Sequence, residues 1–257
     1  MGNKQQPSDT SNGSAIQAQK KIHLVGGEKG GVGKSQVAKT LVEYCLDHKY
    51  DKQFCLVESD LSNPDVGSIY FKRNLKLPNY YEVEFTKDEK KRSGADLVFD
   101  LAMERSVIVN LPSNISSAVS AWLNQNNIFA LAKENNIQIC QWFVCNGGHS
   151  SIEKFKESVN EFPEQITHIF VRNQVIFDDW TFLDKDEELN EILARENVFQ
   201  MDFPQFSFEE RNRVDAGQLT FGQALADDSG FGILSKQRIK NFLRDSYAGF
   251  DKLNLLP

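Results

Sequence analysis

The stretch from Lys21 to Gln36, KIHLVGGEKGGVGKSQ, constrains the fold more than any other part of the chain. An apolar run, Ile22–Val25, ends at glycines, a basic glycine-rich loop follows, and a helical pattern begins at Lys34. Such a loop can turn its backbone N–H groups toward an anion, and the positive end of the next helix faces the same point. The stretch therefore predicts a strand, a phosphate-binding loop and a helix.

The loop departs from the strict phosphate-loop pattern at one position. That pattern needs a glycine, four residues and then Gly-Lys-Ser/Thr. Gly33-Lys34-Ser35 are present, but Glu28 replaces the first glycine, and a variant with a second lysine matches in full from Lys29 to Ser35. We expect Lys34 to bridge the β- and γ-phosphates and the Ser35 hydroxyl to be a ligand of Mg²⁺, which prefers oxygen. A glycine turn that happens to lie near lysines is the disfavoured alternative.

Length and composition are those of one large domain. The chain has 257 residues, of which 40% are hydrophobic and 25% charged, enough for a sizeable core. Its net charge of −7 argues against dominant binding to a nucleic-acid backbone, although a local basic patch is compatible with it. Residues 1–19 are rich in Gln, Ser, Asn and Gly, so we expect a disordered tail before a P-loop ATPase domain over 20–257.

The chain shows the features expected of a cytoplasmic protein. It has no transmembrane-length apolar run and no apolar signal core near the N-terminus. Met1-Gly2 opens like an acylation site, but Gln6 stands where Ser or Thr is needed. The cysteines show no CxxC spacing, and we expect free, buried thiols in a reducing compartment at Cys45, Cys55, Cys140 and Cys145.

Expected strands and helices alternate along the chain. This pattern predicts an α/β fold with a single, mostly parallel, twisted sheet and helices on both of its faces. The expected strands are 21–27, 54–57, 106–111, 137–144, 168–171 and 198–203. The expected helices are 34–48, 94–104, 116–133, 151–162, 184–196, 207–216, 219–227 and 235–250.

Polar residues stand where several of these strands end, at the edge that carries function in parallel sheets. Asp60 follows the second strand and either faces the phosphates or serves as a turn or cap residue. Asn110 stands where nucleotide-hydrolysing sites often carry an Asp that holds Mg²⁺ through water. Asn173 either pairs its amide with an adenine edge or belongs to a turn.

Two further segments leave their roles open. Residues 61–95 are long and irregular, which suits a nucleotide-sensing loop or a partner surface. In the last helix, 235–250, an apolar stripe runs beside basic residues. Core packing is the favoured interpretation of this stripe, and a membrane-surface or DNA-facing helix is the alternative.

The loop from Lys29 to Ser35 resembles the deviant phosphate loop of the ParA/MinD family of ATPases, P-loop NTPases of the SIMIBI type. Glu58-Ser59-Asp60 is similar to that family's Asp-x-Asp motif, and Asn110-Leu111-Pro112 falls at its second acidic strand end. The runs KKIHLVGGEKGGVGKS and NLPSNISSAVSAW look closest to its plasmid mobilisation and stability branch, with TraL-like or MobD-like members.

The resemblance implies a mechanism and a set of site residues. Two ATP-bound subunits would face each other, and Lys29 of each would reach the phosphates of the other. Asp60 would position the attacking water, and slow hydrolysis would dissolve the homodimer. ATP and Mg²⁺ would bind through Gly30, Gly31, Val32, Gly33, Lys34, Ser35 and Gln36, with Asn173 and Pro204 at the adenine, and Glu58 and Asn110 near the metal through water.

Two departures from the family pattern bear on turnover. Glu58 keeps the charge of the Asp it replaces but reaches further, and Asn110 replaces a carboxylate by a neutral amide. The leading hypothesis is an ATP-dependent dimerising switch ATPase that acts in plasmid or mobile-element mobilisation or partition through a partner protein of that DNA system. The alternatives are a nucleotide-binding scaffold with negligible hydrolysis, and a cargo-positioning ATPase that binds DNA directly, which the acidic net charge disfavours.

Overall fold

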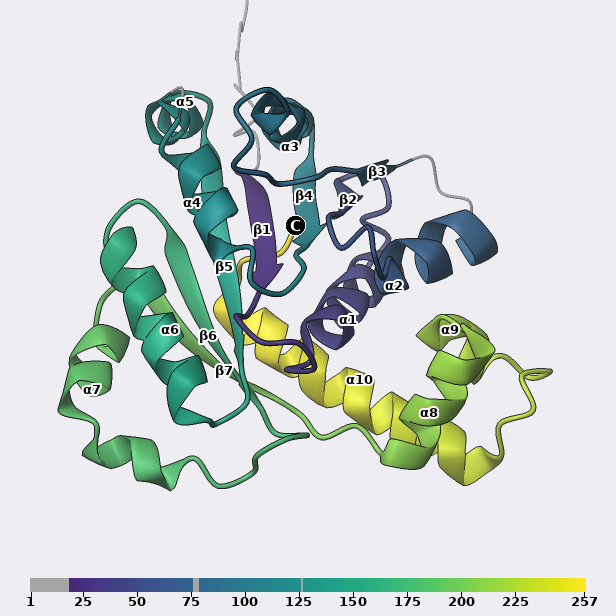
Figure 1. Cartoon of the computed structure of the whole chain (residues 1–257). Helices are drawn as coiled ribbons and strands as arrows, with labels where there is room; N and C mark the ends of the chain where they lie inside the picture. The colour runs from purple at the N-terminus through teal and green to yellow at the C-terminus, as the bar shows by residue number, and fades with distance from the viewer. Residues whose placement is uncertain (1–18, 76–78, 126) are drawn as a thin grey trace, which may run out of the picture.

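One seven-stranded sheet organises the described residues, 19–75, 79–125 and 127–257, of this computed structural model (Figure 1). The strands are β1 (Lys20–Gly26), β2 (Phe54–Glu58), β3 (Tyr80–Glu82), β4 (Ser106–Asn110), β5 (Ile137–Cys145), β6 (Thr167–Asn173) and β7 (Val198–Phe203). Their order is β3-β2-β4-β1-β5-β6-β7, and every pair is parallel. The predicted single parallel sheet is confirmed, whereas nearly all of the predicted tail lies outside the described residues.

Helices cover both faces of the sheet, as the alternating pattern predicts. They are α1 (Lys34–Asp47), α2 (Asp65–Gly67), α3 (Asp96–Ala102), α4 (Ser116–Leu123), α5 (Ile128–Glu134), α6 (His149–Glu161), α7 (Glu187–Leu193), α8 (Phe208–Gly217), α9 (Phe221–Leu225) and α10 (Ile233–Leu253). The chain also forms a π-helical segment, η1 (Ser68–Leu75), and the 3₁₀ turns η2 (Arg92–Ala95) and η3 (Thr181–Lys185). Figure 1 shows α8, α9 and the start of α10 standing to one side of the sheet.

Strand side chains alternate between the two faces, and this alternation divides the core. Val25 and Ile108 belong to the cluster under α1 and α10, whereas Leu24 and Val109 pack with α3, α4 and α5 on the other face. A further cluster joins β5 and β6 to α6 and α7. Each fully buried aliphatic side chain contributes about 1.5–3 kcal/mol relative to an exposed one.

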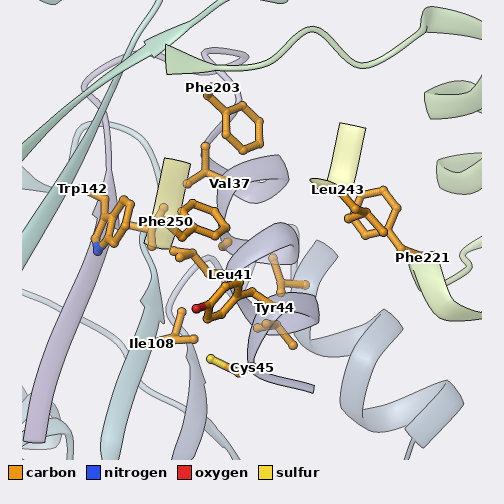
Figure 2. Close-up of a cluster of buried hydrophobic side chains, with 14 of the residues drawn as sticks. Val37, Leu41, Tyr44, Cys45, Ile108, Trp142, Phe203, Phe221, Leu243 and Phe250 are labelled. Atoms are coloured by element: carbon orange, nitrogen blue, oxygen red, sulfur yellow. The ribbon is translucent and has the colours of Figure 1, made fainter. Parts of the chain in front are cut away.

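The long helix α10 is a core element. Figure 2 shows Phe250 among the side chains of α1 and next to Trp142, whose ring centroid lies 5.7 Å from it. Ile239, Phe242 and Leu243 of the predicted apolar stripe are buried as well. Core packing, the favoured interpretation of this stripe, is therefore correct. No helix in the described part of the chain is long and apolar enough to cross a membrane.

Three sequence predictions of local structure need correction. The helix expected over 116–133 is two helices, and Asn127 has a left-handed φ of 57° where α5 begins. The helix expected over 184–196 is shorter, because η3 precedes it. The irregular region 61–95 contributes the edge strand β3, and Tyr80 of that strand packs on Gly67 so closely that a Cβ there would lie 2.1 Å from the ring.

The four cysteines agree with the sequence prediction. Each is buried and free. Cys45 lies on α1, and the other three lie within strands of the sheet. Burial raises the pKa of the Cys55, Cys140 and Cys145 thiols to about 12, so these groups stay protonated at neutral pH.

Candidate nucleotide site

The carboxyl ends of the central strands meet at one edge of the sheet. The strand register pairs Asn110 with Val25 on one side and with Glu58 on the other. At the other half of the sheet, Asn173 pairs with Phe203. The parallel topology thus brings the residues that follow β1, β2 and β4 to the same edge, as the sequence pattern predicts.

Two glycines give the loop between β1 and α1 its shape. Gly31 and Gly33 have φ values of 75° and 101°, which side-chain-bearing residues rarely adopt. Gly33 is the N-cap of α1, and its carbonyl accepts from the Val37 N–H at 3.0 Å. Because α1 starts directly after this turn, its N-terminal N–H groups face the loop, as an anion-binding site requires.

Lys34 lies inside the loop. Its side chain is buried, and its Nζ donates a hydrogen bond of 2.9 Å to the carbonyl of Lys29. Burial lowers the pKa of the Lys34 ammonium, and the carboxylates of Asp60 and Glu28 act in the opposite direction. The loop, the second strand end and this cation therefore share one electrostatic site.

The first half of the loop is open to solvent. Lys29, Gly30 and Gly31 are exposed, and Ser35 and Gln36 are half-buried. The Nε2 atom of Gln36 is buried without a hydrogen-bond partner. The exposed side of the loop leaves Lys29 free to contact a molecule outside the fold.

Glu58 and Asn110 form a closed pair on neighbouring strands. The Asn110 Nδ2 donates to Glu58 Oε1 at 2.8 Å, and the N–H groups of Asp60 and Gly67 donate to the same carboxylate at 3.1 Å each. Burial raises the pKa of the Glu58 carboxyl to about 7, although these donors act against the rise. Asn110 Oδ1 is buried and has no hydrogen-bond partner, so one acceptor of the pair remains available.

Asp60 has the geometry of a turn residue and also lies near the loop. Its Oδ1 accepts from the Ser62 hydroxyl at 2.8 Å and from the Asn63 N–H at 3.2 Å. The carboxylate is half-exposed and close enough to raise the pKa of Lys34. The bonds to Ser62 and Asn63 fit the turn interpretation, and the interpretation that Asp60 faces the phosphates stays a prediction.

Asn173 braces the phosphate-binding loop from the other half of the sheet. Its Nδ2 donates to the Val32 carbonyl at 2.7 Å, and its Oδ1 accepts from the Val175 N–H at 3.0 Å. A Cβ on Gly33 would lie 2.3 Å from the same Nδ2. The half-buried Pro204 follows Phe203, the residue paired with Asn173, so these two predicted adenine contacts lie on adjacent strand ends.

Sequence reasoning missed two structural roles at this site. The first is the bracing bond of Asn173, which no local pattern announces because it joins residues 141 positions apart. The second is the close approach at Gly27, where a Cβ would lie 2.7 Å from the Val144 carbonyl. The double glycine that ends β1 is the signal by which Gly27 could have been found.

The protein oxygens at this edge of the sheet fit a magnesium ion that would be held mainly by phosphate oxygens and water. Within the described residues, no group of three or more His, Cys, Asp or Glu side chains could hold a metal. Mg²⁺ usually keeps several waters and takes one or two protein oxygens beside phosphate oxygens. The Ser35 hydroxyl and the unpartnered Asn110 Oδ1 are oxygens of that kind.

The chain has sequence relatives among known proteins. It matches no protein-family model. It is 32% identical over 156 residues to Protein MobD of Acidithiobacillus ferrooxidans, a match that covers 60% of this chain and 63% of that protein. It is 26% identical over 251 residues to a Protein TraL of Escherichia coli, covering 92% of this chain and 99% of the relative.

A second Escherichia coli Protein TraL is 26% identical over 234 residues, which are 86% of this chain and 92% of that protein. Among solved structures, a chain of the MinC:MinD cell division protein complex of Aquifex aeolicus superposes with a TM-score of 0.48 at 12% identity. That superposition covers 88% of this chain and 94% of the other. The two TraL matches thus extend over most of this chain, whereas the MobD match covers 60% of it and less than two thirds of MobD.

Proposed function

We propose that this protein is an ATP-binding switch that dimerises when ATP is bound, hydrolyses ATP slowly and acts in plasmid or mobile-element transfer through a partner protein. The observation that carries the proposal is the loop itself. A buried lysine, Lys34, lies at the start of α1, and a second lysine, Lys29, stands exposed on the outer side of the same turn. The relatives named MobD and TraL support the transfer role.

The chain's own groups account for nucleotide binding in this proposal. The N–H groups of the loop and of the first turn of α1 bind phosphate oxygens, and Lys34 neutralises charge between them. Ser35 would hold Mg²⁺, with Asn110 and Glu58 reaching it through water. When bound, the ion would neutralise charge on the β- and γ-phosphates. Asp60 accepts a hydrogen bond from the attacking water and orients it.

Lys29 is the reason that we propose a dimer. The lysine is exposed, and the glycines that follow it are exposed too, so a second copy can approach this side of the loop closely. A cation that reaches a phosphate across the interface forms a charge-assisted hydrogen bond, which is worth about 1.5–3 kcal/mol. ATP would then hold two subunits together through contacts that ADP lacks.

The decisive test compares the mass of the protein in solution with and without ATP and Mg²⁺, by light scattering. We expect wild type to be monomeric without nucleotide and dimeric with ATP, and Lys29→Ala to weaken the dimer at least about tenfold. The matched control is Lys52→Ala. It removes an exposed lysine that lies just before β2, at the amino ends of the strands and away from the loop. Equal dimerisation without ATP, or without Lys29, would refute the proposal.

A second candidate is a nucleotide-binding scaffold with negligible turnover. The closed Glu58–Asn110 pair favours it, because the side chains at the metal side of the site already satisfy one another and Asn110 carries no charge. Phosphate release separates the two candidates. If wild type releases phosphate in a Mg²⁺-dependent way and Asp60→Ala abolishes this release, the result argues for the switch. If wild type releases phosphate no faster than Asp60→Ala, the result argues for the scaffold.

Direct binding to DNA has little support from α10. Arg238 pairs with Glu210 at 2.6 Å, and Arg244 pairs with Asp245 at 2.8 Å. Lys236 donates to the Ala226 carbonyl at 2.6 Å. These contacts neutralise or occupy much of the basic stripe, so we prefer action through a partner protein.

A further inference from the structure

We propose that the surface loop between β6 and α7 is a docking site for a basic, amphipathic segment of a partner protein. This aromatic-acidic surface consists of Ile176, Phe177 and Phe182 with the carboxylates of Asp178, Asp179 and Asp184 in the loop and of Glu187 at the start of α7. Figure 1 shows the loop running along the lower edge of the molecule, on the side where the phosphate-binding loop lies. Three features of the loop indicate what kind of segment would bind there: its exposed apolar side chains, the carboxylates around them and the internal contacts that hold the loop in place.

The apolar centre is concentrated and exposed. Ile176, Phe177 and Phe182 are 44%, 38% and 43% exposed, so three of the ten large apolar side chains exposed in the described residues fall within seven positions. Phe182 lines a groove of about 600 Å³ together with the apolar Ile152 and Leu183 and with four polar or charged residues, His149, Lys185, Asp186 and Glu187. A groove next to an exposed ring is a place where an apolar side chain from a partner can bury area.

The rings form one ordered group. Phe177 lies 5.4 Å from Phe182 and 5.8 Å from Trp180, measured between ring centroids, and both contacts are edge-to-face. Trp180 Nε1 donates to the Phe177 carbonyl at 2.8 Å, and Asp179 accepts from both the N–H and the hydroxyl of Thr181. Because the loop is already held by its own bonds, binding to it costs little additional ordering.

The charge around the rings is strongly negative. Residues 176–188 contain six carboxylates and one lysine. Lys156 of α6 neutralises Asp186 and Glu188 at 2.8 and 3.1 Å, but no described residue forms an ion pair with Asp178, Asp179, Asp184 or Glu187. An apolar centre with an acidic rim complements a segment that has an apolar face and flanking Lys or Arg residues. The same rim disfavours nucleic acid and anionic membranes.

The aromatic-acidic surface contacts the phosphate-binding loop through Phe177 and Asn173. Phe177 packs over Gly147, which follows β5 by two residues and where a Cβ would lie 2.7 Å from the ring. The Phe177 N–H donates to the carbonyl of Asn173, whose side chain braces Val32. Docking itself does not depend on nucleotide, whereas a coupling between docking and the loop rests on the proposed function.

The test uses the full-length protein without nucleotide and a synthetic amphipathic helical peptide of lysine and leucine, about 18 residues long. Binding is measured by fluorescence anisotropy. We expect binding that weakens with salt, and no binding of the same peptide with glutamate in place of lysine. Phe182→Ala should weaken binding at least about tenfold, because it removes a central aromatic contact. The double variant Asp178→Asn/Asp184→Asn should weaken it about three- to fivefold.

The control is Ile233→Ala, because Ile233 is 87% exposed on α10 and lies outside the aromatic-acidic surface. We expect unchanged binding for it, and unchanged ATP binding for all of these variants. If the peptide does not bind wild type, the proposal is overturned. Equal affinity of the peptide for wild type and Phe182→Ala would also overturn it, because the peptide would then be adsorbing to an acidic protein in general. A Phe182→Ala variant that fails to dimerise with ATP but binds the peptide normally would also overturn it, in favour of a second copy as occupant.

Discussion

The phosphate-binding loop and the Glu58–Asn110 pair lie at the same edge of the sheet but are built in different ways. The loop is made of backbone: glycines with φ values of 75° and 101° form it, and its first residues are exposed. The pair is made of side chains, fully buried on adjacent strands and bonded to each other at 2.8 Å. One part of the site is open to a ligand, and the other is closed on itself.

Under the proposed function, this difference bears on how well the chain would bind ATP and on how fast it would hydrolyse it. Binding of phosphate needs N–H donors and a cation, and the loop offers both before any ligand arrives. Hydrolysis would need a charged, water-accessible group near the phosphates. The pair offers only a buried carboxyl with a raised pKa and an amide, so this role would fall to the half-exposed Asp60 alone. We therefore expect tight nucleotide binding with slow turnover, and the variants below test each half separately.

The largest effect is expected where the backbone of the loop is changed. Gly33→Ala places a methyl group 2.3 Å from Asn173 Nδ2 at a residue with a φ of 101°. The left-handed backbone and the clash together should lower the free energy of unfolding by about 3–4 kcal/mol and abolish ATP binding. Urea unfolding and ATP titration measure both.

The matched control for Gly33→Ala is Gly94→Ala. A Cβ at Gly94 meets nothing within 4 Å, and its φ is not in the left-handed region. We expect the control to stay within about 0.5 kcal/mol of wild type. If both variants unfold at the same urea concentration as wild type, the loop is far more adaptable than its geometry indicates.

The next effect concerns the closed pair and has a pH dependence. In wild type, the pKa of Glu58 is raised to about 7, so its contribution to stability is present below about pH 4.5 and is lost as the pH rises through 7. Asn110→Asp puts a second carboxyl beside it and raises the pKa values of the pair further. The free energy of unfolding of Asn110→Asp should therefore keep falling above pH 7 and be about 3 kcal/mol lower than that of wild type at pH 8.

Unfolding measured at pH 5 and pH 8 checks this sign. Glu43, another buried carboxyl whose pKa is raised to about 7, contributes the same trend to both proteins, so the difference between them isolates the pair. At pH 5 the variant should lie within about 1 kcal/mol of wild type. A deficit of equal size at both pH values would mean that the Asn110→Asp substitution disturbs packing rather than protonation.

The same comparison explains how much could be predicted from the sequence. The loop follows from local chemistry, since glycines, lysines and a helix start are contiguous, and the order of strands and helices follows from hydrophobic periodicity. The edge strand β3 was missed because it has three residues and lies in a charge-rich, irregular segment. The break between α4 and α5 depends on one left-handed asparagine.

Side-chain pairing across the sheet was beyond the reach of the sequence. The positions of Glu58, Asn110 and Asn173 at strand ends were predicted correctly, because parallel topology fixes them. Their partners were not predicted, because each bond joins residues far apart in the chain and depends on rotamer and register. The roles proposed for these residues toward ATP and Mg²⁺ stay predictions.

The smallest effect separates two roles of Asn173. As a brace, its amide holds the Val32 carbonyl and the Val175 N–H, so Asn173→Ala leaves two polar groups without partners. We expect a loss of about 1–2 kcal/mol in the protein without nucleotide. Gln174→Ala, which removes an exposed bond to Asp202, is the control and should cost less than about 0.5 kcal/mol. If Asn173 serves only to recognise adenine, Asn173→Ala will leave the stability of the nucleotide-free protein unchanged and weaken the binding of ATP alone.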